Sequence, residues 1–93
     1  MNQADATALV TEALLSLPTI SRRVPLPLIT DDTLLFESEE NGGLGLDSLD
    51  AVELVVIVQK RFGIEIRDME EGKAAFRSVR ALASYIEGRL SGG

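Results

Sequence analysis

The spacing of hydrophobic residues predicts that most of this chain is made of amphipathic helices. The first stripe repeats at i, i+3, i+4, i+7, i+8 and i+11, which is the spacing of one helical face. Its members are Ala6, Leu9, Val10, Ala13, Leu14 and Leu17. Asn2 or Asp5 can cap the start of this helix. Pro18 is expected to end it, because the residue before a proline is pushed out of the α region.

The longest apolar run predicts a second helix from about Ser48 to Phe62, with Gly63 placed to end it. Its core face consists of Ala51, Leu54, Val55, Val58 and Phe62. A second stripe on the same helix consists of Leu49, Val52 and Val56, flanked by the carboxylates of Asp47, Asp50 and Glu53. An exposed apolar ridge bordered by acids is typical of a surface that docks into a groove with basic edges. The alternative is a central helix that is buried nearly all round.

The remaining pattern predicts two more helices and no sustained strand. Ile64 and Ile66 alternate with polar residues, which indicates an extended step that turns them inward. A short helix over residues 69–71 could be capped by Asp68 and would be weakened by Gly72. Ser78 can cap the last helix, whose stripe is Val79, Leu82, Ala83, Ile86 and Leu90. The expected fold is therefore all-α, a small four-helix bundle of three longer helices and one short helix. We expect one domain over residues 1–93, with 91–93 as a frayed tail.

Residues 18–47 are expected to form a long loop between the first and second helices. Pro18, Pro25 and Pro27 argue against regular helix in its early part. We expect its apolar residues to hold it across the core, with a helical turn near 31–36; they are Ile20, Val24, Leu26, Leu28, Ile29, Leu34, Leu35 and Phe36. The adjacent Arg22 and Arg23 are interpreted as solvated.

The segment 37–43 is acidic and turn-rich, which raises the question of a calcium loop. Glu37, Glu39 and Asn41 have nearly the required spacing. The twelfth position of such a loop, however, falls on Ser48, where a bidentate glutamate is needed. A solvated loop is the preferred interpretation, and no metal site is expected.

The composition narrows the possible functions. The 93 residues are 45% hydrophobic, which suits one modest core, and they contain no cysteine and no histidine. The formal net charge of −6 argues against nucleic acid and favours partners with positive patches. The amino terminus lacks a basic region followed by an apolar core, and no apolar stretch is long enough to span a bilayer. We expect a soluble, cytoplasmic monomer without a transmembrane segment.

The start of the second predicted helix is the candidate functional site. Asp47 or Ser48 can cap this helix, and a hydroxyl at this position faces out of the first turn. The free N–H groups and the helix dipole favour an anion there. A phosphodiester esterified to Ser48 would therefore lie in a favourable field.

These residues resemble the attachment site of acyl carrier proteins, whose Asp-Ser-Leu serine receives 4′-phosphopantetheine from coenzyme A. The resemblance runs from Leu46 to Leu54 and continues through 62–66. Ser78-Val79 and Tyr85-Ile86 are similar to the start and end of the family's last helix. With the first helix included, the similarity covers nearly the whole chain.

The resemblance implies a non-catalytic carrier. Ser48 would receive the arm from a phosphopantetheinyl transferase with magnesium, and the thiol of the arm would hold an acyl group as a thioester. Further implied partners are an acyl-loading ligase or transferase and a ketosynthase or acyltransferase. Residues that match partner-contacting positions of the family are Asp47, Leu49, Asp50, Val52, Glu53 and Val56.

The chain also departs from many fatty-acid carriers. It has Gln59, Lys60 and Arg61 where these carriers keep glutamates, and it carries extra residues around 37–43 and 72–76. These differences favour a specialised carrier, for example in polyketide or envelope-lipid synthesis, over a housekeeping role in fatty-acid synthesis.

Other functions are tested against the same residues. An aminoacyl or peptidyl carrier shares the arm and the bundle, so it is the nearest alternative. An unmodified helical adaptor could use the Leu49, Val52 and Val56 ridge alone. A sulfur carrier activated at the Gly92-Gly93 end would need a strand-rich fold. A serine hydrolase is excluded, because Ser48 lacks a Gly-x-Ser-x-Gly context and the chain has no histidine to take the proton.

Overall fold

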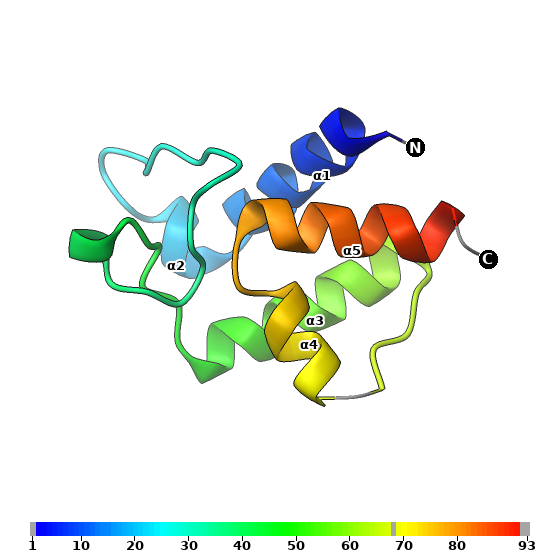
Figure 1. Cartoon of the computed structure of the whole chain (residues 1–93). Coiled ribbons are helices and arrows are strands. Elements are labelled where there is room, and N and C mark those ends of the chain that lie inside the picture. Colours follow the sequence, from blue (N-terminus) through cyan, green and yellow to red (C-terminus); the bar gives the residue numbers. More distant parts are fainter. Residues whose placement is uncertain (1, 68, 92–93) are drawn as a thin grey trace.

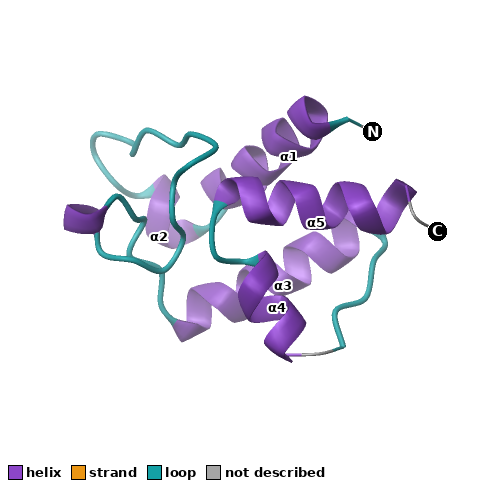
Figure 2. Ribbon diagram, in the orientation of Figure 1, coloured by secondary structure: helices purple, strands orange, loops and turns teal. Residues whose placement is uncertain are grey.

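The computed structural model describes residues 2–67 and 69–91, and its elements in this part of the chain are helical. The helices are α1 (Gln3–Leu15), α2 (Pro18–Ser21), α3 (Ser48–Phe62), α4 (Met69–Ala75) and α5 (Val79–Ser91), with a 3₁₀ turn η1 (Glu39–Asn41). Figures 1 and 2 show the three long helices packed together, with the long connection that contains α2 and η1 gathered at one end. The expected all-α class is confirmed. The described residues hold β-bridges only as isolated pairs.

The first helix forms the centre of the packing. The side chain of Asn2 accepts a hydrogen bond from the Asp5 backbone N–H at 2.8 Å, so Asn2 is the cap. The stripe predicted from the sequence lies in the core, against α5 and α3, except for Leu9, which is only partly buried. Its fully buried members are Ala6, Val10, Ala13, Leu14 and Leu17.

The expected role of Pro18 is only partly right. The first helix does stop before it, at Leu15, but Pro18 then begins the separate helix α2. Proline is well tolerated at the first position of a helix, because its missing N–H would have no intrahelical partner there. This short helix places Ile20, which is fully buried, into the core.

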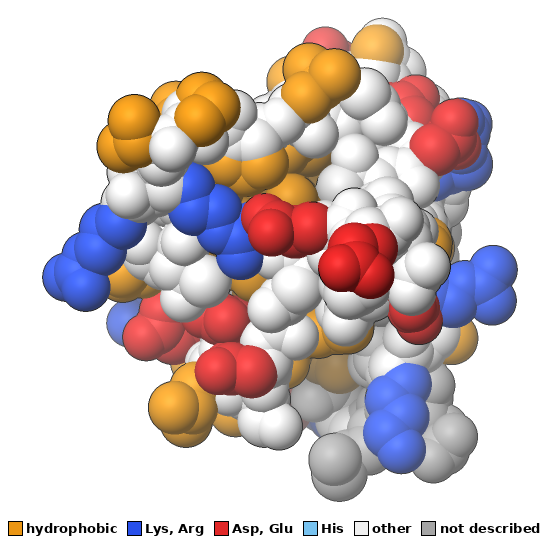
Figure 3. Space-filling view, turned by 90° about the vertical axis from the view of Figure 1, so that its left-hand side faces the viewer, with side chains coloured by type: hydrophobic (Ala, Val, Ile, Leu, Met, Phe, Trp, Pro, Cys, Tyr) orange, Lys and Arg blue, Asp and Glu red, His pale blue; other side chains and the backbone are white. Residues whose placement is uncertain are grey.

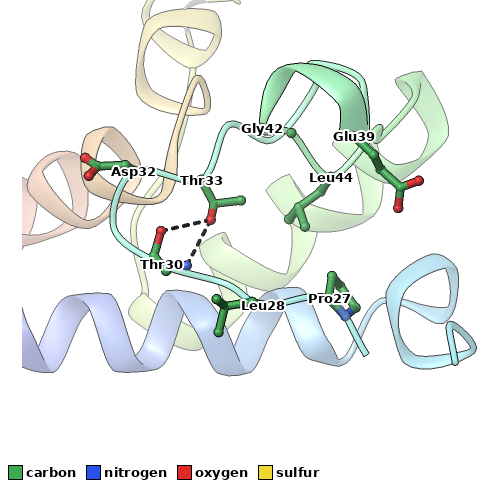
Figure 4. Close-up of a pocket in the computed structure, with 9 residues that line it drawn as sticks. Pro27, Leu28, Thr30, Asp32, Thr33, Glu39, Gly42 and Leu44 are labelled. Carbon is green, nitrogen blue, oxygen red and sulfur yellow. Dashed lines mark hydrogen bonds between the residues drawn. The ribbon is translucent and has the colours of Figure 1, made fainter. Parts of the chain in front are cut away.

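The second half of the long connection is held in place by backbone hydrogen bonds to two other segments of the chain. The Leu44 N–H donates to the Leu34 carbonyl at 2.9 Å, and the Leu35 N–H donates to the Arg77 carbonyl at 3.1 Å. The helical turn expected near 31–36 does not form, because these backbone groups pair across the chain instead. A turn closed by the Thr33 hydroxyl, which accepts from the Thr30 N–H at 2.9 Å, stands there (Figure 4).

The first half of the connection contradicts the prediction that its apolar residues enter the core. Val24, Leu26 and Leu28 are 96%, 57% and 84% exposed. Prolines restrict the backbone of this segment, and its Pro27 and Leu28 line one side of a cavity of about 390 Å³ (Figure 4). Figure 3 views this end of the molecule and shows exposed hydrophobic side chains beside acidic and basic ones.

Arg23 anchors this segment, whereas the sequence suggested that it is merely solvated. Its guanidinium donates to the Leu44 carbonyl at 2.6 Å through Nη2 and to Glu39 at 3.0 Å through Nη1. These bonds join the start of the connection to η1 and to the chain that leads into α3. Arg22 is exposed, as expected.

The C-terminal half follows the predicted pattern closely, except that Leu90, the last member of the predicted stripe, is 40% exposed. Gly63 ends α3 with a φ of 65°, in the left-handed region that glycine tolerates. Ile64 is buried, and the Ile66 N–H donates to the Gln59 side chain at 3.0 Å. The short helix α4 is longer than the predicted 69–71, and its expected cap, Asp68, lies outside the described residues. Ser78 caps α5 as predicted, through its hydroxyl and the Ala81 N–H at 3.0 Å.

The tail was expected to fray from residue 91, but Ser91 still belongs to α5. Gly92 and Gly93 lie outside the described residues. No helix in the part of the chain that the structure describes is long and apolar enough to cross a membrane.

Candidate functional site at the start of helix α3

The first turn of α3 is fixed by a reciprocal pair of hydrogen bonds. Asp47 is the N-cap: its Oδ1 accepts from the Asp50 N–H at 3.0 Å. The Asp50 Oδ2 accepts in return from the Asp47 N–H at 3.1 Å. This arrangement is a capping box in which aspartates take both roles. The sequence left Asp47 and Ser48 open as caps, and the geometry selects Asp47.

Ser48 is the first residue inside α3, and its side chain is free to react. The residue is exposed, and the described part of the structure gives its hydroxyl no hydrogen bond. Because the cap uses Asp47, the Ser48 oxygen has no structural task in the helix start. It also lies where unpaired N–H groups and the dipole of the helix favour a bound anion.

A largely apolar groove of about 510 Å³ begins at Ser48. One wall comes from α3, and the other comes from Phe36 in the connection, from Ile66 and from α4 with Phe76. Its lining consists of Phe36, Ser48, Ala51, Val52, Val55, Val56, Ile66, Arg67, Gly72, Lys73 and Phe76. The sequence did not identify the residues of the second wall as part of the site, because they come together only in the folded chain.

The second stripe of α3 is exposed, as the sequence predicted. Leu49, Val52 and Val56 are 76%, 62% and 41% exposed. Leu54 and Val58, on the opposite face, are fully buried. The alternative of a helix buried nearly all round is therefore wrong. We call these three exposed side chains the α3 ridge, and the exposed Asp47 and Glu53 lie on the same helix start.

Asp50 does not border this ridge as an accessible acid. It is only 7% exposed, and its Oδ1 accepts a hydrogen bond from the Thr19 hydroxyl of α2 at 2.7 Å. The pKa of Asp50 lies below its ordinary value, chiefly because this hydrogen bond stabilises the charged form, while burial acts in the opposite direction. The acidic rim expected from the sequence thus lacks one of its three members.

The site has the features of a site for covalent attachment. Its reactive group is a serine hydroxyl, and the two nearest carboxylates are occupied as cap partners. Among the described residues, no group of three or more acids could hold a metal ion. An exposed hydroxyl at the mouth of an apolar groove suits a group that is bonded to Ser48 and can fold back against the protein.

The comparisons with known proteins agree with this class of protein. A family model described as phosphopantetheine attachment site matches residues 42–86, which include the first turn of α3 and most of the groove. An acyl carrier protein of Campylobacter hominis is 41% identical over 59 residues, covering 63% of this chain and 72% of the relative. Acyl carrier protein 3 of Ralstonia nicotianae is 37% identical over 60 residues, covering 64% of this chain and 67% of the relative.

The fold and the site define a small helical carrier domain. The chain belongs to the acyl carrier protein family. The cofactor of this kind of protein is 4′-phosphopantetheine, held covalently. The structure fits this group, because an exposed hydroxyl with no hydrogen-bond partner among the described residues stands at the helix start, and an apolar groove lies beside it. The arm would supply the thiol that a chain without cysteine lacks.

Proposed function

We propose that Ser48 carries the 4′-phosphopantetheine arm and that acyl intermediates travel as thioesters on its terminal thiol. The observation that supports this most directly is the exposed Ser48 hydroxyl, which takes no part in the capping box formed by Asp47 and Asp50. A serine committed to the cap could react only by giving up that role. The helix start also provides a favourable field for the phosphodiester.

We further propose that partner enzymes dock on the α3 ridge. Leu49, Val52 and Val56 expose apolar surface on one helix face, and the latter two also border the groove beside Ser48. Asp47 and Glu53 give that surface a negative border, which suits an enzyme groove with basic edges. The first such partner is a phosphopantetheinyl transferase, which brings coenzyme A and magnesium. Acyl-loading ligases or transferases and ketosynthases or acyltransferases would follow.

The groove beside Ser48 supports an acyl cargo. Phe36, Ile66 and Phe76 face α3 across a volume of about 510 Å³. An acyl chain that folds back into this space removes apolar surface from water, which is worth about 0.8 kcal/mol for each buried CH₂ group. Cargo can therefore be sheltered between visits to partner enzymes. An aminoacyl or peptidyl carrier would share the arm, but the relatives reported above are named acyl carrier proteins.

The second half of α3 supports a specialised rather than a housekeeping pathway. Gln59 is occupied with the Ile66 N–H, and Arg61 pairs with Glu12 of α1 at 3.1 Å. The negative surface is thus limited to the start of the helix, so a partner must recognise a shorter acidic patch. We propose polyketide or specialised lipid synthesis as the setting, with fatty-acid synthesis as the alternative, and a cytoplasmic monomer as the working form.

The proposal is tested with Ser48→Ala and a matched control, Ser84→Ala. Both remove an exposed hydroxyl from a helix, but Ser84 lies on α5 and only bonds Gln3. Each purified protein is incubated with coenzyme A, magnesium and a phosphopantetheinyl transferase, and its mass is measured. Ser84→Ala should gain the arm, and Ser48→Ala should not, with both thermal midpoints close to wild type. Loading of the folded Ser48→Ala variant would show that the arm is attached elsewhere.

A further inference from the structure

We infer that Thr19 is a positioning residue for the Ser48 site: its hydroxyl holds the Asp50 carboxylate in the orientation that closes the first turn of α3. This inference rests on the proposed attachment at Ser48 and adds a residue that is 31 positions away from Asp50 in the sequence. It also gives Asp50 a role inside the protein in place of a role in docking.

The geometry divides the Asp50 carboxylate between two donors. Oδ1 accepts from the Thr19 hydroxyl at 2.7 Å, and Oδ2 accepts from the Asp47 N–H at 3.1 Å. Asp47 closes the ring by accepting from the Asp50 N–H at 3.0 Å. Ser48 lies within this ring of bonds, directly after Asp47. The orientation of the residue that bears the hydroxyl therefore depends on a donor in α2.

The donor itself is held in place from both sides. Leu17, directly before α2, and Ile20, within it, are both fully buried, whereas Thr19 lies on the exposed side of this short helix. Their packing holds the α2 backbone against the core, and the Thr19 hydroxyl reaches Asp50 from this anchored helix. Hydrogen bonds to charged groups are stronger than neutral ones, and a buried carboxylate that loses a donor is costly. Removal of the Thr19 hydroxyl should thus leave Oδ1 unsatisfied and loosen the capping box.

The same geometry determines which acidic side chains at the start of α3 a partner protein can contact. At 7% exposure, the Asp50 charge faces α2 rather than solvent, and Arg23 nearby further favours its charged form. A basic partner then meets Asp47 and Glu53, which are exposed. The two candidate roles of Asp50, internal clamp and docking charge, predict different responses to salt.

The first test compares Thr19→Val, which keeps the shape but removes the hydroxyl, with Thr19→Ser, which keeps the hydroxyl. Thr11→Val is the matched control, because the Thr11 hydroxyl donates to the Thr7 carbonyl within α1, away from the Ser48 site. We expect Thr19→Val to lower kcat for arm transfer roughly fivefold to tenfold with little change in KM, since a charge-assisted hydrogen bond is lost while the α3 ridge is intact. Thr19→Ser should stay within about twofold of wild type, and Thr11→Val should behave as wild type.

The pKa of the Asp50 carboxyl, followed by NMR, provides the second readout and should rise in Thr19→Val. If Thr19→Val transfers the arm at the wild-type rate, or if Thr19→Ser is as slow as Thr19→Val, the inference is wrong. Lower stability without a change in transfer would also contradict it, because that is the signature of a purely structural bond.

A second variant keeps the test decisive even if Thr19→Val does not fold. Asp50→Asn keeps one acceptor oxygen and removes the charge, and Glu53→Gln removes a charge from the exposed surface. The internal role predicts that transfer to Asp50→Asn keeps the wild-type dependence on salt, whereas Glu53→Gln weakens that dependence. Equal weakening by both variants would overturn the inference. Wild-type protein that is never loaded at Ser48 would instead overturn the proposed function.

Discussion

The same substitution on opposite faces of α3 should separate recognition from stability. Leu49 is 76% exposed on the α3 ridge, whereas Leu54 is fully buried in the core. Full burial of a leucine side chain is worth about 1.5–3 kcal/mol, so a partner that covers the remaining three-quarters of Leu49 gains about 1–2 kcal/mol. Leu49→Ala should therefore lower kcat/KM for arm transfer about 5-fold to 30-fold, because about 1.4 kcal/mol corresponds to a factor of ten.

For stability we expect the opposite order, with Leu54→Ala more destabilising than Leu49→Ala. Leu54→Ala creates a cavity in the core and should cost about 2–5 kcal/mol of unfolding free energy, as large-to-small core substitutions do. For a domain of this size about 1 kcal/mol shifts the thermal midpoint by roughly 4–8 °C, so a fall of roughly 8–40 °C is expected. Leu49→Ala should stay within about 0.5 kcal/mol of wild type, because it changes only exposed surface.

The assay combines thermal unfolding with initial rates of arm transfer at several carrier concentrations. The Leu54→Ala rates are measured well below its midpoint, where the protein is folded, and should be close to wild type. If Leu49→Ala accepts the arm as fast as wild type, the α3 ridge is not the docking surface. If Leu49→Ala lowers the free energy of unfolding as much as Leu54→Ala does, the assignment of the two faces of α3 is wrong.

Three further predictions address the loop before α3, the buried acid and the charged border. A Cβ at Gly43 would collide with the Glu37 carbonyl, whereas a Cβ at Gly88 would meet open space on α5. Gly43→Ala should therefore lower the free energy of unfolding measured with denaturant, and Gly88→Ala should raise it by about 0.5–1 kcal/mol. Equal effects of the two substitutions would contradict this prediction. Because the folded-state pKa of Asp50 is lowered, its contribution to stability is present above the unfolded-state pKa and is lost as the pH falls through the folded value. Thermal midpoints from about pH 6 down to pH 2 should show this acid-side loss in wild type and a smaller one in Thr19→Val. Glu53→Lys should slow arm transfer most at low salt, and a slowing that salt does not change would argue against electrostatic docking.

The helices that bear a long, regular stripe could be predicted from the sequence. The bounds of α3 follow from its periodicity, from an aspartate at its start and from Gly63 at its end, and the structure has them at Ser48–Phe62 as expected. Each of these signals is local, and here all of them agree with one another. The exposure of the α3 ridge also followed, because one buried face of a helix does not need two apolar stripes.

The features that the sequence did not predict correctly depend on contacts between segments that are far apart in the chain. Pro18 is compatible with either the end of one helix or the start of the next. The new helix is stabilised by the packing of Ile20 in the core, which the local sequence does not reveal. Val24 and Leu35 are similar in hydrophobicity, yet one is 96% exposed and the other is fully buried. Backbone hydrogen bonds to residues 42–46 and 77–80 decide which part of the connection enters the core.

In the candidate site, too, some features follow from the local sequence and others depend on distant contacts. The position of Ser48 at a helix start could be derived from its neighbours. The burial of Asp50 could not, because its partner Thr19 lies in a four-residue helix that has no periodicity to reveal it. The groove likewise needs Phe36 and Phe76, which the sequence places on separate segments and the fold brings to one wall.

The central claim is tested most directly by the intact mass of the wild-type chain. The protein is measured before and after incubation with coenzyme A, magnesium and a broad-specificity phosphopantetheinyl transferase, and the modified peptide is then sequenced. The account predicts the gain of one phosphopantetheine, located at Ser48. An unchanged mass in a folded, helical sample, or a modification located at Gly93, would contradict it and would favour an unmodified adaptor or chemistry at the carboxyl terminus.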